Sequence, residues 1–195
     1  MKKRKFSLTI ILGGCLVLLS LFLLIVLQIR AHTGNRQSQR IASKMEELLP
    51  ERTAGVPGTY SFTTMPVLEI EGTDYSAMLE IPAFGCTLPV ADKWDSSKLS
   101  RSPARFWGSA YDGTLVIGGS DDPQQFGFCD KIGHGTQVIL TDMTGSRFTY
   151  TVSRIDRSRH AETYWLATAD DDLTLFCHDI SSTEYIAVRC TFAYN

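Results

Sequence analysis

The sequence predicts a mostly β protein, a closed β-barrel with one or two short helices, preceded by an N-terminal transmembrane helix. Two observations lead to this fold class. From Val67 onward, short runs rich in Val, Ile, Thr, Phe and Tyr alternate with turn residues, as in proteins built from many short strands. No helical pattern separates successive runs regularly, which argues against a parallel doubly wound sheet and favours a closed barrel.

The first residues carry the membrane signal. Phe6–Leu27 is apolar apart from a few Ser, Thr and Gly residues, and such a helix spans roughly 33 Å, about the thickness of a bilayer core. Because the basic flank Lys2–Lys5 stays in the cytoplasm, we expect a cytoplasmic tail at residues 1–5 and a signal-anchor at 6–28. The C-terminal part of this single-pass membrane protein is then extracellular. A cleaved signal peptide is the alternative, but its apolar region is usually shorter, about 7–15 residues.

The charge is distributed unevenly along the chain. Residues 1–30 hold five of the 19 Lys and Arg residues and no acid, so residues 31–195 carry 14 basic and 21 acidic residues. An acidic domain argues against nucleic-acid binding, which depends on cations that neutralise phosphates. No cofactor is expected, and no metal either, because zinc-site spacing is absent among the outer cysteines Cys86, Cys129, Cys177 and Cys190.

Residues 29–66 are expected to hold a helix and a linker before the barrel domain at residues 67–195. Within Asn35–Leu49, apolar residues recur at helical spacing among charged ones, and Pro50 ends the helix. Glu51–Pro66 contains several Gly and Pro residues. It is therefore interpreted as a linker, which either hangs free or lies on the barrel.

The barrel domain contains a series of predicted strands separated by turn residues. The runs are Tyr75–Ile81, Cys86–Val90, Thr114–Ile117, Gln137–Thr141, Arg147–Ile155, Asp172–Cys177 and Tyr185–Phe192. Asp142–Ser146 joins two of these runs and indicates a hairpin.

Several blocks of sequence in this domain follow a recognisable order. They are Leu79–Val90 (LEIPAFGCTLPV), Leu115–Asp121 (LVIGGSD), Phe126–Val138, Asp172–His178 (DLTLFCH) and Tyr185–Cys190 (YIAVRC). These blocks resemble the motifs LEIPxLGxxLPV, LVIAGHN, FGxLxxIxxGDxV, DLTLFTC and RVTVRC of the sortases, membrane-anchored cysteine transpeptidases of Gram-positive bacteria. The resemblance covers roughly Val67 to Cys190, is nearest to class B, and implies the sortase-type barrel.

The resemblance also implies a mechanism. A cysteine thiolate attacks a Thr–Gly bond in a sorting signal such as LPXTG and forms a thioester, and an amine then takes the acyl group. A histidine protonates the leaving amine, and an arginine stabilises the developing oxyanion. The partner that the resemblance implies is a sorting-signal-like peptide or a cell-envelope protein.

The residues at these three positions differ from the family's pattern. The family's His falls on Ser120, its Cys on His178 and its Arg on Tyr185. A serine hydroxyl cannot serve as a general acid near pH 7, and a phenol brings no positive charge. We therefore expect a pseudosortase that binds a peptide or envelope partner, with Asp121 and Asp179 as further groove-binding candidates.

Cys177 leaves open the alternative of an active sortase-type transpeptidase or peptidase with a rearranged site. A shift of one residue would bring this thiol to the nucleophile position. In an unshifted strand, neighbouring side chains point to opposite faces, so His178 faces the groove and Cys177 faces the core. A third interpretation is a domain that packs beside other envelope proteins and uses no peptide groove.

Overall fold

The computed structural model describes residues 8–160, 162–167, 170–179 and 183–194, without the side chains of 8–11, 25–36 and 179. The chain divides between Arg36 and Gln37 into two compact units. The second unit contains the barrel, together with the segments that connect it to the N-terminal helix.

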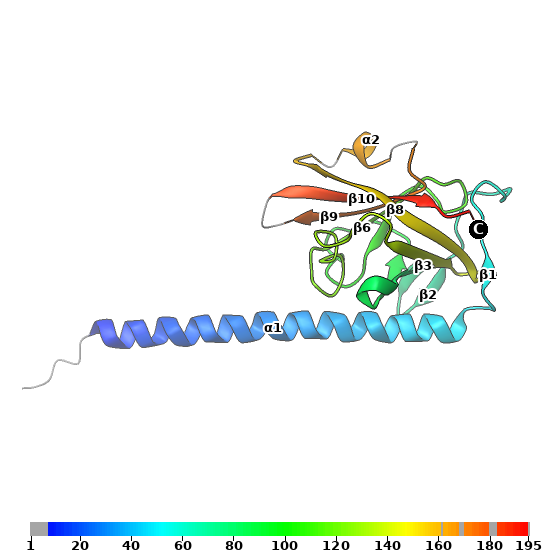
Figure 1. Cartoon of the computed structure of the whole chain (residues 1–195). Helices are drawn as coiled ribbons and strands as arrows, with labels where there is room; N and C mark the ends of the chain where they lie inside the picture. Colours follow the sequence, from blue (N-terminus) through cyan, green and yellow to red (C-terminus); the bar gives the residue numbers. More distant parts are fainter. Residues whose placement is uncertain (1–7, 161, 168–169, 180–182, 195) are drawn as a thin grey trace, which may run out of the picture. The chain divides into compact units, whose positions relative to one another are not determined.

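Helix α1 runs without a break over Leu8–Leu48 (Figure 1). The helix predicted at Asn35–Leu49 therefore ends as expected but begins much earlier. The sequence between the apolar run and Asn35 contains no proline that would end a helix. A single glycine such as Gly34 costs a helix only about 1 kcal/mol, so the two helical segments join. Where side chains are described, no helix is long and apolar enough to cross a membrane.

In the described part of the chain, ten strands and two short helices follow α1. They are β1 (Thr53–Ala54), β2 (Leu68–Ile70), β3 (Thr73–Ile81), η1 (Pro82–Phe84), β4 (Cys86–Ala91), β5 (Ala104–Trp107), β6 (Leu115–Gly119), β7 (Gln137–Asp142), β8 (Ser146–Ser158), α2 (Thr163–Leu166), β9 (Leu173–Asp179) and β10 (Glu184–Phe192). The predicted strands coincide with β3, β4 and β6 to β10.

Eight of these strands close into a barrel. The strands β8, β10, β9, β6, β5, β4 and β3 lie side by side in that order, and β7 pairs with both β3 and β8. The remaining strands are short additions, with β1 beside β8 and β2 beside β3. The prediction of a mostly β, closed barrel with few helices is thereby confirmed.

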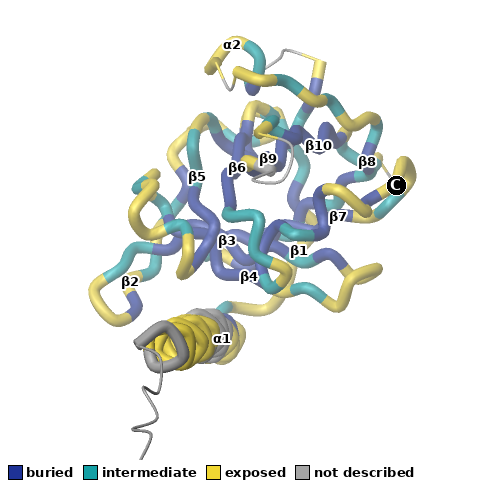
Figure 2. The backbone as a smooth tube through the Cα atoms, turned by 90° about the vertical axis from the view of Figure 1, so that its left-hand side faces the viewer, coloured by how far each residue is buried: buried dark blue, intermediate teal, exposed yellow. Residues whose placement is uncertain are grey.

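The barrel encloses the main hydrophobic core. Figure 2 shows that buried residues, in dark blue, follow the strands, whereas exposed residues follow the loops. Along β9, Leu173, Leu175 and Cys177 belong to the core, whereas Phe176 belongs to a second cluster on the outer face. This alternation is the usual period of two in a strand, and it decides which candidate residues face outward.

The segment between α1 and β2 lies on the barrel. Strand β1 pairs with β8, and Met65 is buried in the main core. The ring of Tyr60 stacks on Tyr111, with 4.2 Å between ring centroids. Of the two alternatives that the sequence left open for this segment, the structure therefore shows the packed one.

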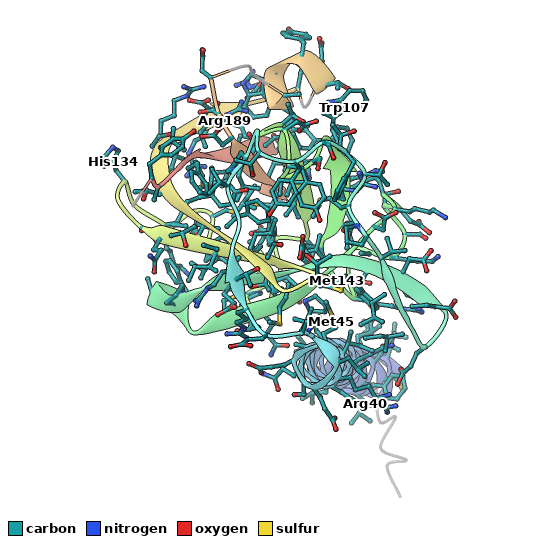
Figure 3. The ribbon with its side chains drawn as sticks, turned by 90° about the vertical axis from the view of Figure 1, so that its right-hand side faces the viewer. Arg40, Met45, Trp107, His134, Met143 and Arg189 are labelled. Atoms are coloured by element: carbon teal, nitrogen blue, oxygen red, sulfur yellow. The ribbon has the colours of Figure 1, made fainter. Side chains whose placement is uncertain are left out.

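Residues 37–48 of α1 belong to the same unit as the barrel. Ile41 and Met45 pack against Tyr75 and Met78 of β3 in a smaller apolar cluster. Figure 3 shows Met45 on the barrel side of the helix, below Met143. Apolar residues at helical spacing thus bury one face of this helix, as the sequence pattern indicates.

Candidate functional site

The ends of three neighbouring strands, β6, β9 and β10, meet at the predicted site. Tyr185 of β10 is the register partner of His178 in β9, and Gly119 of β6 is the partner of Cys177. Ser120 directly follows Gly119. Ser120, His178 and Tyr185 therefore lie in one row across three adjacent strands, which we call the site row.

The site row is polar and partly accessible. His178 is exposed and Tyr185 is half-buried, and the centroids of their rings are 4.7 Å apart. The hydroxyl oxygen of Ser120 is buried and has no hydrogen-bond partner in the described part of the chain. These groups can donate and accept hydrogen bonds, but none of them carries a fixed charge.

The two acidic candidates next to the site row differ in their surroundings. Asp121 follows Ser120 and is half-buried. Burial raises the pKa of the Cys129 thiol, and contact with Cys177 and the charge of Asp121 raise it further. Asp179 ends β9, but its side chain lies outside the described residues.

The thiols of the barrel lie in apolar surroundings. Cys177 is 0% exposed and packs in the core with Cys129 and Cys190, on the opposite face of β9 from His178. Burial raises the pKa of Cys190, and it raises the pKa of the half-buried Cys86 to about 11. A cysteine nucleophile needs conditions that favour its thiolate. The surroundings of Cys86 and Cys190 favour the neutral thiol instead.

The remaining histidines whose side chains are described, His134 and His160, do not belong to the site row. His134 is exposed in a turn before β7 and projects outward (Figure 3), and His160 is exposed just after β8. The side chain of His32 lies outside the described residues. Among the residues that the structure describes, no group of three or more His, Cys, Asp and Glu side chains is placed to hold a metal ion.

Arg189, which the sequence analysis did not single out, is a fully buried cation in β10, below α2 (Figure 3). Its guanidinium pairs with Asp156 at 3.0 Å and donates hydrogen bonds to the backbone carbonyls of Leu166, at 2.6 Å, and Trp165. Arg189 thereby fastens α2 to the barrel. In the sequence, Arg189 is the single charged residue within the apolar run Ile186–Cys190. A charge in such a run indicates that the side chain is buried and paired with other polar groups.

Aromatic rings cover the outer face beside the site row. Phe176 lies two residues before His178, on the same side of β9. Trp94 stacks on Phe176 with 5.5 Å between centroids, and Phe106 meets both rings edge-on. Gly118 leaves room for them, because an added Cβ would lie 2.6 Å from the Phe176 ring. An apolar patch therefore adjoins the polar row.

Comparison with known protein families decides the family. Residues 79–192 match the model of the sortase domain. The protein belongs to the sortase family. A comparison with curated protein sequences gave no significant match.

Solved sortase structures share the fold. Sortase A from Corynebacterium diphtheriae gives a TM-score of 0.55 at 19% identity, over 63% of this chain and 62% of that protein. Sortase C1 from Streptococcus agalactiae gives 0.55 at 20% identity, over 66% and 72%. A Clostridium perfringens sortase D5 transpeptidase gives 0.54 at 19% identity, over 62% and 80%. The chain thus spans less than two thirds of the Corynebacterium protein, and the closeness to class B stays a prediction.

In this sortase-family domain, the alignment of Ser120, His178 and Tyr185 with the family's His, Cys and Arg stays a prediction. The strand pairing is compatible with it, because groups that act on one bond must lie close together. No shift of β9 is needed to form the row, since His178 and Tyr185 are direct register partners.

Proposed function

We propose that this sortase-family domain is a pseudosortase, which binds an extended peptide or another cell-envelope protein at the site row and does not catalyse transpeptidation. The observation that carries the proposal is the composition of the row. It offers the hydroxyl of Ser120, the imidazole of His178 and the phenol of Tyr185, whereas the adjacent thiol, Cys177, is buried on the opposite face of β9.

The site row lacks the side chain that each step of transpeptidation requires. Thioester formation needs an accessible thiolate, and Cys177 is enclosed in the core. The Ser120 hydroxyl makes no hydrogen bond to a base in the described part of the chain, so it is not activated as a substitute nucleophile. Tyr185 can give an oxyanion one neutral hydrogen bond, whereas a guanidinium gives several together with a charge.

The same groups suit the binding of a peptide. An extended chain presents carbonyl and amide groups that can bond to the accessible side chains of His178 and Tyr185, whose ring centroids are 4.7 Å apart. The adjoining ring of Trp94, which is 36% exposed and stacks on the buried Phe176, offers an apolar surface for its side chains. Tyrosine and tryptophan are enriched among the residues that contribute most to binding energy.

The proposal includes an extracellular position for the domain, with the N-terminal segment as a single-pass membrane anchor. The basic residues Lys2–Lys5 before the apolar run Phe6–Leu27 support this orientation. In that position, the partner would be a peptide or protein exposed at the outer side of the membrane.

The proposal is tested with full-length protein in a mild detergent, titrated with sorting-signal peptides such as LPXTG in the presence of an amine acceptor. We expect saturable binding without cleavage. His178→Ala and Tyr185→Ala should each weaken binding about tenfold, since each removes a contact in the centre of the row. The matched variants His134→Ala and Tyr194→Ala change exposed residues elsewhere and should leave affinity unchanged.

Two results would contradict the proposal. Peptide cleavage that disappears in a Cys177→Ala variant would favour the active transpeptidase with a rearranged site. Failure of every sorting-signal peptide to bind would favour a domain that packs beside envelope proteins without using the row.

A further inference from the structure

A pocket of about 720 Å³ lies between the end of α1, the β2–β3 turn and the loop between β4 and β5. All its lining residues belong to the unit that begins at Gln37. None of Ser120, His178 and Tyr185 lines it, although Trp94, which stacks on Phe176 beside the site row, does. Its lining combines apolar, hydroxyl and charged side chains.

Backbone geometry and one aromatic ring shape this pocket. Glu71 and Gly72 have φ angles of 53° and 74°, so the chain reverses between β2 and β3 in a two-residue turn. Trp94 forms part of the wall that comes from the loop after β4, where it is held by its stacking on Phe176. The pocket thus has an apolar ring on one side and polar groups around it.

Glu71 is neutralised by cations from outside the pocket. Lys44 of α1 donates a hydrogen bond to its carboxylate at 2.7 Å, and Arg40, labelled in Figure 3, pairs with the same oxygen. The hydrogen bond from Lys44 is the main cause that lowers the pKa of Glu71. Neither Lys44 nor Arg40 lines the pocket, so the charge of Glu71 is balanced before any ligand enters.

Of the other charged lining residues, the two acids are paired and one cation is left over. Asp74 lies 3.9 Å from Lys93, and Asp95 lies 3.2 Å from Lys98. Arg101 has no acidic partner within salt-bridge distance among the described residues, although it lines the same pocket. This exposed guanidinium at the pocket is therefore available to pair with an anionic ligand.

The lining of the pocket contains buried hydroxyl groups. Ser38 lines the pocket and is only 4% exposed, yet its Oγ has no hydrogen-bond partner in the described part of the chain. A buried polar group without a partner costs about 1–3 kcal/mol, so such groups are normally satisfied. Ser102, 8% exposed, adds a second buried hydroxyl to the lining.

We propose that this pocket binds the phosphate group of a small molecule or of a lipid headgroup, with Arg101 as the counter-ion and Ser38 as a hydrogen-bond donor. A guanidinium binds phosphate through two parallel hydrogen bonds, and the further phosphate oxygens accept from hydroxyl groups such as that of Ser102. The pocket is larger than a phosphate. The organic part of the ligand accordingly lies beside Trp94.

The test uses full-length protein in a neutral detergent and isothermal titration calorimetry with two probes. Glycerol 1-phosphate represents a soluble source of the phosphate, and dihexanoyl phosphatidylglycerol represents a lipid source. Glycerol is the phosphate-free control. We expect saturable binding of at least one probe, and a probe that binds about tenfold tighter than the other identifies the source.

Variants then separate the pocket from the rest of the protein. Arg101→Ala should weaken binding at least about tenfold, because it removes the only free cation of the lining among the described residues. Ser38→Ala should weaken it about threefold without lowering the melting temperature of the free protein, since it removes a buried hydroxyl that makes no hydrogen bond there. Arg159→Ala, an exposed arginine outside the pocket, is the matched control.

The absence of saturable binding by both probes would overturn the inference, as would binding that survives both Arg101→Ala and Ser38→Ala. His178→Ala should leave phosphate binding unchanged. The outcome is therefore independent of the proposed peptide-binding function.

Discussion

The outer face of β9 and β10 has two ends that use polar groups in opposite ways. At one end, Arg189 and Thr174 are register partners and both are buried, and the guanidinium donates to the Thr174 hydroxyl at 3.2 Å. At the other end, His178 and Tyr185 are register partners, yet they are exposed and half-buried. The first end holds the fold together, whereas the second leaves its polar groups available to a partner.

The difference follows from the cost of burying a charge. A buried guanidinium is tolerated only when its hydrogen bonds are satisfied, and Arg189 finds acceptors in Asp156 and in the backbone of α2. Tyr185 lies four residues earlier in the same strand, where the arginine of the family is expected. The arginine of β10 thus stabilises the fold, and the residue that β10 contributes to the site row is not a cation.

The largest effect is expected from restoring the family's side chains at the end of the strands that carries His178 and Tyr185. Ser120→His, His178→Cys and Tyr185→Arg together should produce thiol-dependent cleavage of a sorting-signal peptide, because imidazole, thiol and guanidinium would then lie on adjacent strands. Product formation is followed by chromatography, with and without a thiol-alkylating reagent.

The control for this restoration carries His178→Ala in place of His178→Cys and should be inactive. A well-folded triple variant that cleaves no member of a broad set of sorting-signal peptides would show that the three positions do not form the family's site.

The next largest effect is expected at the end of the strands that carries Arg189. Arg189→Ala should lower the free energy of unfolding by about 3–5 kcal/mol, since it removes one partner of a buried, hydrogen-bonded network. Chemical denaturation in detergent measures the loss, and Arg159→Ala should stay within about 0.5 kcal/mol of the wild type. A loss of about 1 kcal/mol or less, the scale of a surface ion pair, would mean that Arg189 does not anchor α2.

The smallest effect distinguishes the two faces of β9. Cys177→Ser should lower the free energy of unfolding by about 1–3 kcal/mol, because it buries a hydroxyl in an apolar core. His178→Ser should change it by less than about 0.5 kcal/mol, since this side chain is exposed. Equal losses from these adjacent substitutions would be incompatible with the orientation of the strand, and denaturation curves of both variants decide the matter.

The strands that build the core could be predicted because their apolar residues are contiguous in sequence. The predicted run Asp172–Cys177 differs by only a few residues from β9, and Tyr185–Phe192 lacks only the first residue of β10. Strand β5 was missed. It is four residues long and joins β4 through a single pair, Ala91 and Ala104, so little in its sequence distinguishes it from a loop.

The adjacency of Ser120, His178 and Tyr185 could be expected because these residues fall within sequence blocks that resemble one family, and their roles stay a prediction. The network of Arg189 and the pocket around Arg101 could not, because they join segments far apart in the chain. Ser38 and Arg101 are separated by four strands, and no periodicity of the sequence shows that they line one cavity. Buried polar groups become meaningful only when their neighbours are known.

The closure of the barrel by β7 has a consequence for behaviour at high protein concentration. In the described part of the chain, the sheet terminates in β1 and β2, which are two and three residues long. Long unpaired edges are what allow neighbouring molecules to join sheet to sheet and grow into aggregates. Because these edge strands are short, we expect copies of this protein at high concentration not to join sheet to sheet. Recognition of a partner should then depend on side chains.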